Sequence, residues 1–112
     1  MAYQSVTTID NSVVSAAGGG NAGFTQLIAL PQQTWENRTC HAIKIAGGPG
    51  TERIGVYFVG GLHAREWGSP DILVRLIDDV THAYKTNHGV TYGAQSSNTP
   101  AARATRACPR HA

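Results

Sequence analysis

One run of apolar residues, which hardly alternates with polar ones, most constrains the fold of this 112-residue chain. Residues 54–59 read IGVYFV, and Gly60 and Gly61 follow them. A half-buried strand alternates apolar and polar residues with period two, whereas a strand covered on both faces is apolar throughout. We therefore predict that residues 54–59 form a central strand of a sheet and that both of its faces are covered.

Three further segments have patterns of regular structure. Residues 25–30 are apolar and end at a proline, and residues 39–46 alternate, so each predicts a strand. Residues 6–17 carry apolar side chains at spacings compatible with a short helix. The glycine-rich run 18–23 should end that helix.

The clearest helix is predicted over residues 69–86. Ser69 is expected as its N-cap, Pro70 at its first position and Asp71 in its first turn, where a carboxylate complements the helix dipole. The apolar residues share one face and most charged residues lie on the other. The apolar face comprises Ile72, Leu73, Leu76, Ile77, Val80, Ala83 and Tyr84. Strand, glycine-rich loop and helix in this order predict an α/β fold with a mixed sheet.

The final segment, residues 93–112, differs from the rest because it contains no Val, Ile, Leu, Met, Phe, Trp or Tyr. We predict one folded unit over residues 1–92 and a disordered tail over 93–112. The tail holds three of the nine Lys and Arg residues and no acid, so it accounts for the net charge of +2. Because the body has no basic stripe with interleaved aromatics, we do not expect a nucleic-acid partner.

Composition also bears on whether the chain is a membrane, exported or disulfide-rich protein. No stretch approaches the roughly 18 consecutive apolar residues of a membrane span, so we expect no membrane partner. The N-terminus does not have the pattern of a signal peptide, so we expect a cytoplasmic location. Cys40 and Cys108 lack CxxC spacing and do not support a disulfide framework. The oligomeric state cannot be predicted from these features.

The residues best suited to bind a metal ion lie in the loop between the predicted strand at 54–59 and the predicted helix at 69–86. His63 and Glu66 are three residues apart in a loop, which is where sites of α/β proteins occur. An imidazole nitrogen and a carboxylate oxygen at this spacing can turn toward one point, and they are two of the three protein ligands of a His₂Glu zinc site. The pattern H-x-x-E alone is weak, because such pairs are frequent in surface loops.

Several spaced motifs together resemble the N-terminal part of a zinc carboxypeptidase of the carboxypeptidase A type. They are LIALP at residues 27–31, TWENR at 34–38, CHAIKI at 40–45, GVYFVGG at 55–61 and HAREW at 63–67. The resemblance implies a mixed-sheet α/β/α fold, of which this chain is the N-terminal portion. It also implies Zn²⁺ as cofactor, peptide or protein C-termini as substrate, and removal of the C-terminal residue by metal-activated water.

By the same resemblance, His63 and Glu66 match the first two zinc ligands and Arg65 matches an arginine of the substrate cleft. The family's second zinc-binding histidine and its general-base glutamate lie farther downstream than this chain reaches, so no catalytic residue is assigned here. We expect this chain to be inactive on its own. The alternative is a catalytically dead remnant that acts at most as an interaction module.

Overall fold

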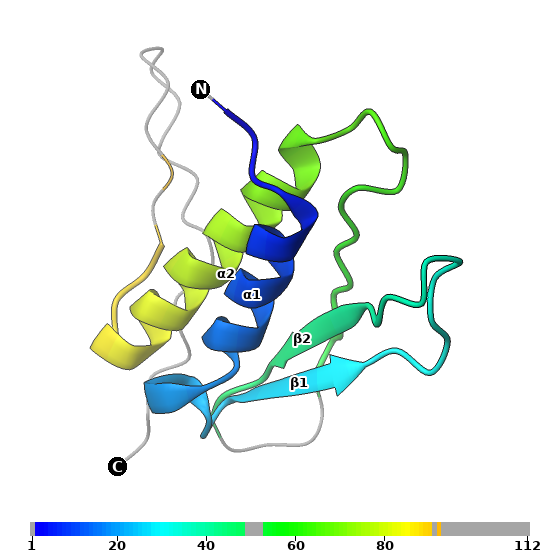
Figure 1. Ribbon diagram of the computed structural model, residues 1–112. Helices are drawn as coiled ribbons and strands as arrows, with labels where there is room; N and C mark the ends of the chain where they lie inside the picture. The colour runs from blue at the N-terminus through cyan, green and yellow to red at the C-terminus, as the bar shows by residue number, and fades with distance from the viewer. Residues whose placement is uncertain (1, 49–52, 91, 93–112) are drawn as a thin grey trace.

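Two helices and a two-stranded sheet form the described part of the computed structural model, residues 2–48, 53–90 and 92. In chain order they are α1 (Val6–Ala16), a 3₁₀ turn η1 (Gly19–Asn21), β1 (Thr25–Ala29), β2 (His41–Ile45) and α2 (Gly68–Thr86). The two helices lie side by side, and α1 contacts both strands (Figure 1). The predicted α/β class is confirmed, whereas the predicted tail lies outside the described residues.

Helix α1 begins and ends where its sequence indicates. The Ser5 side chain caps its N-terminus by accepting a hydrogen bond from the Thr8 amide, at 3.1 Å. The glycine-rich run ends the helix, and Gly19 takes a positive φ of 56°, which suits a residue without a side chain. The Asn21 side chain then donates from Nδ2 to the carbonyl oxygen of Ala16 at 2.8 Å, which satisfies one of the free carbonyls at the helix end.

The strands β1 and β2 confirm both predictions made for their segments. They pair antiparallel, with Leu27 opposite Ile43 at the centre of the register. His41 at the start of β2 is half-buried, and its Nδ1 lies 2.7 Å from Asp10 Oδ1 of α1. This contact joins the helix to the sheet and occupies one nitrogen of the imidazole.

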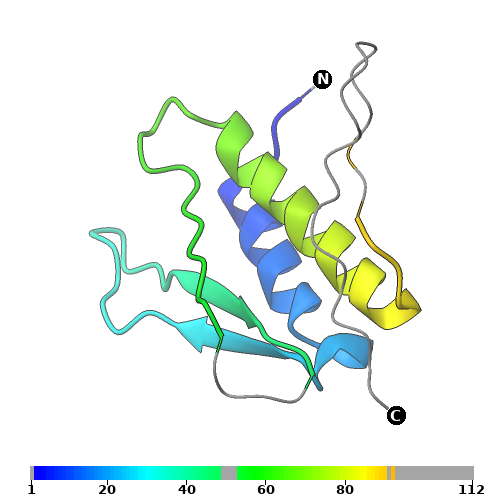
Figure 2. The same cartoon turned by 180° about the vertical axis from the view of Figure 1, so that it is seen from behind.

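The prediction of a central strand at residues 54–59 is wrong for this structure. The segment is extended but belongs to no sheet of the described chain, where the only pairing is that of β1 with β2 (Figure 2). Ile54 is 95% exposed and Tyr57 80% exposed. An apolar run becomes a central strand only when strands flank it and elements cover both faces, and the described residues provide neither.

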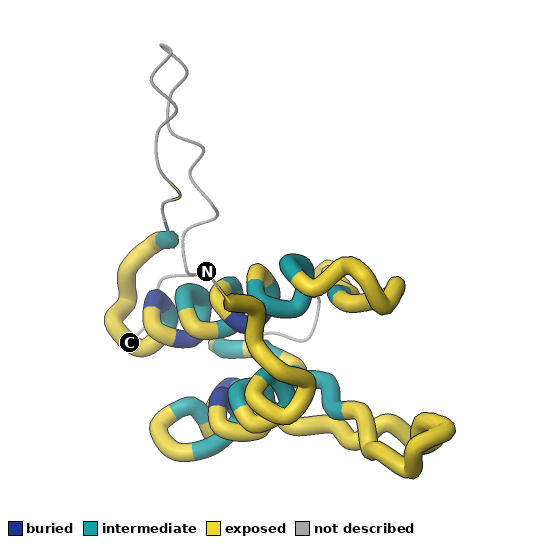
Figure 3. Tube along the Cα trace, turned by 45° about the horizontal axis from the view of Figure 1, so that its top comes forward, coloured by how far each residue is buried: buried dark blue, intermediate teal, exposed yellow. Residues whose placement is uncertain are grey.

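Few residues are buried, and they lie on the helices and at the entry to β1 (Figure 3). They are Ala16, Phe24, Val74, Thr81 and Ala83. The rings of Phe24 and Tyr84 meet with their centroids 4.4 Å apart, which ties the C-terminal part of α2 to β1. This aromatic contact is the centre of the small core.

Helix α2 has the predicted extent, and every residue of its predicted apolar face except Ile72 is buried or half-buried. It ends at Thr86, followed by Asn87 in the left-handed conformation with φ of 56°. Val74 and Thr81, seven residues apart and outside the predicted apolar face, are buried, whereas Ile72 is 68% exposed. The covered surface of α2 is thus wider than the predicted face, and α2 packs against α1. Neither described helix is long and apolar enough to cross a membrane.

Tyr92 should titrate at an unusually alkaline pH. Desolvation raises its pKa first, and the Asp79 carboxylate raises it further, while Arg75 lowers it. A raised pKa means that folding favours the neutral phenol, so the stability it contributes is complete below about pH 10 and is lost as the pH rises through the folded-state pKa.

We expect Asp79→Asn to lower the pKa of Tyr92 toward its ordinary value, as measured by NMR titration of the Tyr92 ring. Asp78→Asn is the matched control, because Asp78 is the adjacent acid and does not contribute to the shift. An equal change in both variants would contradict a specific role for Asp79.

Candidate metal-binding loop

The loop that holds His63 and Glu66 runs over residues 60–67 and leads directly into α2. Gly60 lies so close to the helix that a Cβ there would be 2.8 Å from Leu73 Cδ1 and 3.1 Å from the Pro70 backbone nitrogen. Gly61 has a positive φ of 71°, which favours glycine. The glycine pair thus lets the chain approach the start of α2 and turn away into the loop.

The Ser69 hydroxyl joins the two ends of this loop. It accepts a hydrogen bond from the Gly61 amide at 2.8 Å and donates one to the Glu66 carbonyl at 2.9 Å. The predicted N-cap role of Ser69 is therefore wrong. Trp67 occupies the cap position, and its side chain makes no hydrogen bond to the amides of the first helical turn.

Backbone and aromatic contacts fix the middle of the loop. The Glu66 amide donates to the His63 carbonyl at 3.0 Å, so both candidate ligands belong to one turn. The Trp67 indole donates to the Ala64 carbonyl at 2.5 Å. Its ring meets that of Tyr3 edge-on, with centroids 6.1 Å apart and planes at 75°. The N-terminal segment therefore braces the loop, a contact that no local sequence pattern indicated.

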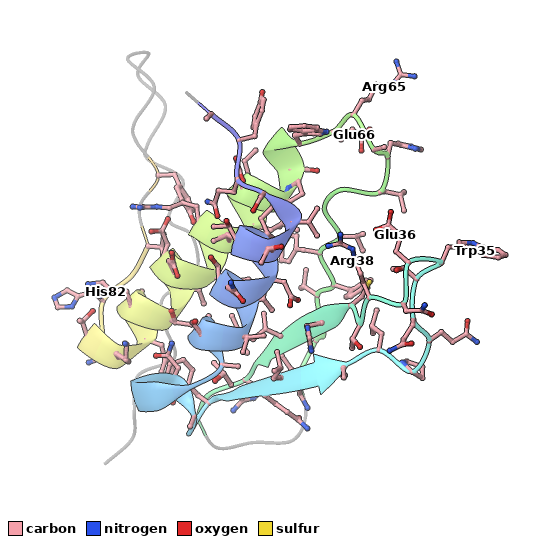
Figure 4. The ribbon with its side chains drawn as sticks, viewed as in Figure 1. Trp35, Glu36, Arg38, Arg65, Glu66 and His82 are labelled. Atoms are coloured by element: carbon pink, nitrogen blue, oxygen red, sulfur yellow. The ribbon has the colours of Figure 1, made fainter. Side chains whose placement is uncertain are left out.

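The side chains of His63, Arg65 and Glu66 are all exposed. Arg65 projects away from the body of the molecule, and Glu66 lies near the start of α2 (Figure 4). Neither His63 nor Glu66 makes a side-chain hydrogen bond to another described residue, so both retain their ligating atoms. The convergence of the two side chains on one point stays a prediction.

A third ligand is not provided by the described residues, which contain no group of three or more His, Cys, Asp or Glu able to hold a metal ion. His82 is exposed on the polar face of α2 and lies at the opposite end of that helix from Glu66 (Figure 4). His41 is engaged by Asp10. Among the described residues, His63 and Glu66 are therefore a pair of candidate ligands without a third.

Two surface hollows of the described chain lie away from the loop. One, of about 560 Å³, runs between α1 and α2 and is lined mostly by polar residues, among them Asn11, Asn21 and Lys85. The other, of about 680 Å³, lies beside Tyr92. Neither includes His63 or Glu66, and we place the candidate site in the loop, because two metal-ligating groups share a turn there.

Comparison with known proteins agrees with the motifs of this region. A sequence model described as zinc carboxypeptidase matches residues 22–98, which is more than half of the chain. A curated relative, zinc carboxypeptidase A 1 of Anopheles gambiae, is 42% identical over 45 residues. That match covers 40% of this chain and 10% of the relative, so this chain matches only about a tenth of the relative's length.

Proposed function

Because the chain belongs to the zinc carboxypeptidase family, we propose that the loop at residues 60–67 supplies His63 and Glu66 to a peptidase zinc site. One observation supports this proposal: the hydrogen bond from the Glu66 backbone amide to the His63 carbonyl keeps the two candidate residues in one turn. The Ser69 hydroxyl bonds both ends of the loop, so the loop backbone is held in place before a metal ion binds. Zinc, when bound, would supply an acidic water and polarise the scissile carbonyl.

Each polar side chain of the loop has a distinct role in the proposed site. His63 offers a neutral nitrogen donor and Glu66 an anionic oxygen donor, which together suit a divalent cation. Arg65 is exposed beside them, and its guanidinium can bind a carboxylate through two parallel hydrogen bonds. We therefore propose the C-terminus of a peptide as the group that Arg65 recognises.

Completion of the proposed site needs groups beyond the described residues. A third protein ligand and a general base are absent from the loop, and no described His, Cys, Asp or Glu gathers near it to supply them. In this proposal the segment contributes part of a zinc shell and part of a substrate cleft. The short matched share of the curated relative supports this interpretation.

Zinc should bind His63 and Glu66 in preference to other surface groups. In an NMR titration with Zn²⁺, we expect the His63 ring signals to shift before those of the other histidines. His63→Ala and Glu66→Gln should each weaken binding more than about tenfold, because even residues outside the ligand shell affect metal affinity by 10- to 100-fold.

The matched control is His82→Ala, which removes an exposed imidazole from the far end of α2. It should leave the titration of His63 unchanged. Equal responses from His63 and His82 at every zinc concentration would show binding to isolated imidazoles only, and the proposed pairing with Glu66 would be wrong.

A further inference from the structure

Tyr3 contacts the candidate metal-binding loop although it lies far from it in the sequence. Its ring meets the Trp67 ring edge-on, with centroids 6.1 Å apart and planes at 75°. A Cβ on Gly68 would be 3.8 Å from Tyr3 Cε1, so the tyrosine ring also lies against the start of α2. Tyr3 is outside residues 22–98, which the zinc carboxypeptidase model matches, so the family match gives it no role.

Helix α1 sets the position of Tyr3. Tyr3 lies two residues before Ser5, whose side chain caps α1 and whose carbonyl accepts a hydrogen bond from the Ile9 amide at 3.0 Å. Helix α1 in turn packs against α2. The N-terminal segment therefore passes beside the first turn of α2, where it reaches Trp67 (Figure 1).

Trp67 connects this contact to the two candidate ligands. It follows Glu66 directly in the chain, and its indole donates to the Ala64 carbonyl at 2.5 Å. That bond overlaps the turn in which the Glu66 amide donates to the His63 carbonyl. Residues 61–67 are all exposed, so hydrogen bonds and the Trp67 side chain hold this turn in place of a packed core. A contact that fixes Trp67 therefore also fixes the turn.

We propose that Tyr3 is a positioning residue for the two candidate zinc ligands, a role that rests on the proposed function of the loop. Its ring holds Trp67, and Trp67 keeps His63 and Glu66 in one turn, so less ordering is needed when the metal ion binds. The apparent affinity for a ligand falls with the fraction of molecules in the binding conformation. Loss of an aromatic pair changes such an equilibrium by roughly two- to tenfold.

Hydrogen exchange of the Glu66 amide tests the contact without any metal. In Tyr3→Ala we expect this amide to exchange roughly two- to tenfold faster, because the turn opens more often when Trp67 loses its partner. Tyr3→Phe keeps the ring and should keep the exchange rate of the unaltered chain. Amides in the middle of α2 should exchange as before in both variants, because Tyr3 is 60% exposed and its loss leaves the core intact.

Tyr57→Ala is the matched control, because Tyr57 is also an exposed tyrosine but is in no ring contact with a described residue. It should leave exchange of the Glu66 amide unchanged. An unchanged rate in Tyr3→Ala would overturn the proposal. An equal rise in Tyr3→Ala and Tyr57→Ala would overturn it as well, because the effect would not depend on the contact with Trp67.

Zinc titration of the His63 ring signals measures the consequence for the metal. Tyr3→Ala should raise the zinc dissociation constant roughly two- to tenfold, and Tyr3→Phe should leave it unchanged. Faster exchange of the Glu66 amide together with an unchanged zinc affinity would overturn the positioning role. If His63→Ala left zinc binding unchanged, the proposed zinc site itself would be wrong, whereas the exchange measurement would still decide whether Tyr3 holds the turn.

Discussion

The 112-residue chain should release C-terminal residues from peptides at a rate near background. The described residues supply two candidate zinc ligands and no group of three, so half of a tetrahedral shell has no protein donor and zinc affinity should fall by orders of magnitude. The family resemblance assigns no general base to the described residues, and lack of such a base costs roughly 10²- to 10⁴-fold in rate.

The measurement is bound zinc after dialysis, followed by release of C-terminal Phe, Leu, Arg and Lys from blocked dipeptides. His63→Ala is the control for any residual activity. Stoichiometric zinc together with turnover that this variant abolishes would contradict the expectation. Such a result would mean that another residue of the chain completes the site, and the remaining histidines would then be tested by the same substitution.

Local patterns predicted the elements that depend on local interactions. The helix over Val6–Ala16 follows from its Ser5 cap and the glycines after it, and α2 ends at Thr86 because Asn87 adopts the left-handed conformation. The strands β1 and β2 lie within their predicted ranges. Each of these signals is contained within a few neighbouring residues, so the sequence alone carries it.

The failures concern long-range packing. Residues 54–59 have the composition of a central strand, but their state depends on flanking strands that no pattern within the segment can supply. Ile72 belongs to the predicted apolar stripe of α2, yet it is exposed, whereas Val74 and Thr81 outside that stripe are buried. Composition predicts a need for burial, and only the arrangement of elements decides where burial occurs.

At the candidate site, too, the residues were predicted from local patterns, whereas the contacts that hold them were not. His63 and Glu66 were predicted from their residue types and their place before a helix, and Arg65 from the family resemblance, and the roles of all three stay predictions. The hydrogen bonds of Ser69 that hold this loop were not predicted, because a serine before a proline is also typical of an N-cap. A hydroxyl that can serve two roles takes the one favoured by tertiary structure, and here it bonds Gly61 and Glu66.

Phe24→Ala should remove most of the stability of the fold. Phe24 is 9% exposed and contacts the Tyr84 ring at 4.4 Å between centroids, where α2 meets the entry to β1. Truncating a buried Phe to Ala costs about 3–5 kcal/mol, and small domains have about 5–15 kcal/mol in total. The other buried apolar residues among those described are Ala16, Val74 and Ala83, which are small and cannot fill the cavity.

Urea unfolding followed by far-UV circular dichroism measures this loss as a lower midpoint at an unchanged slope. Trp35→Ala is the matched control, because Trp35 is also aromatic but fully exposed, and its removal should change stability by no more than about 0.5 kcal/mol. A loss of similar size in both variants would contradict a core centred on Phe24.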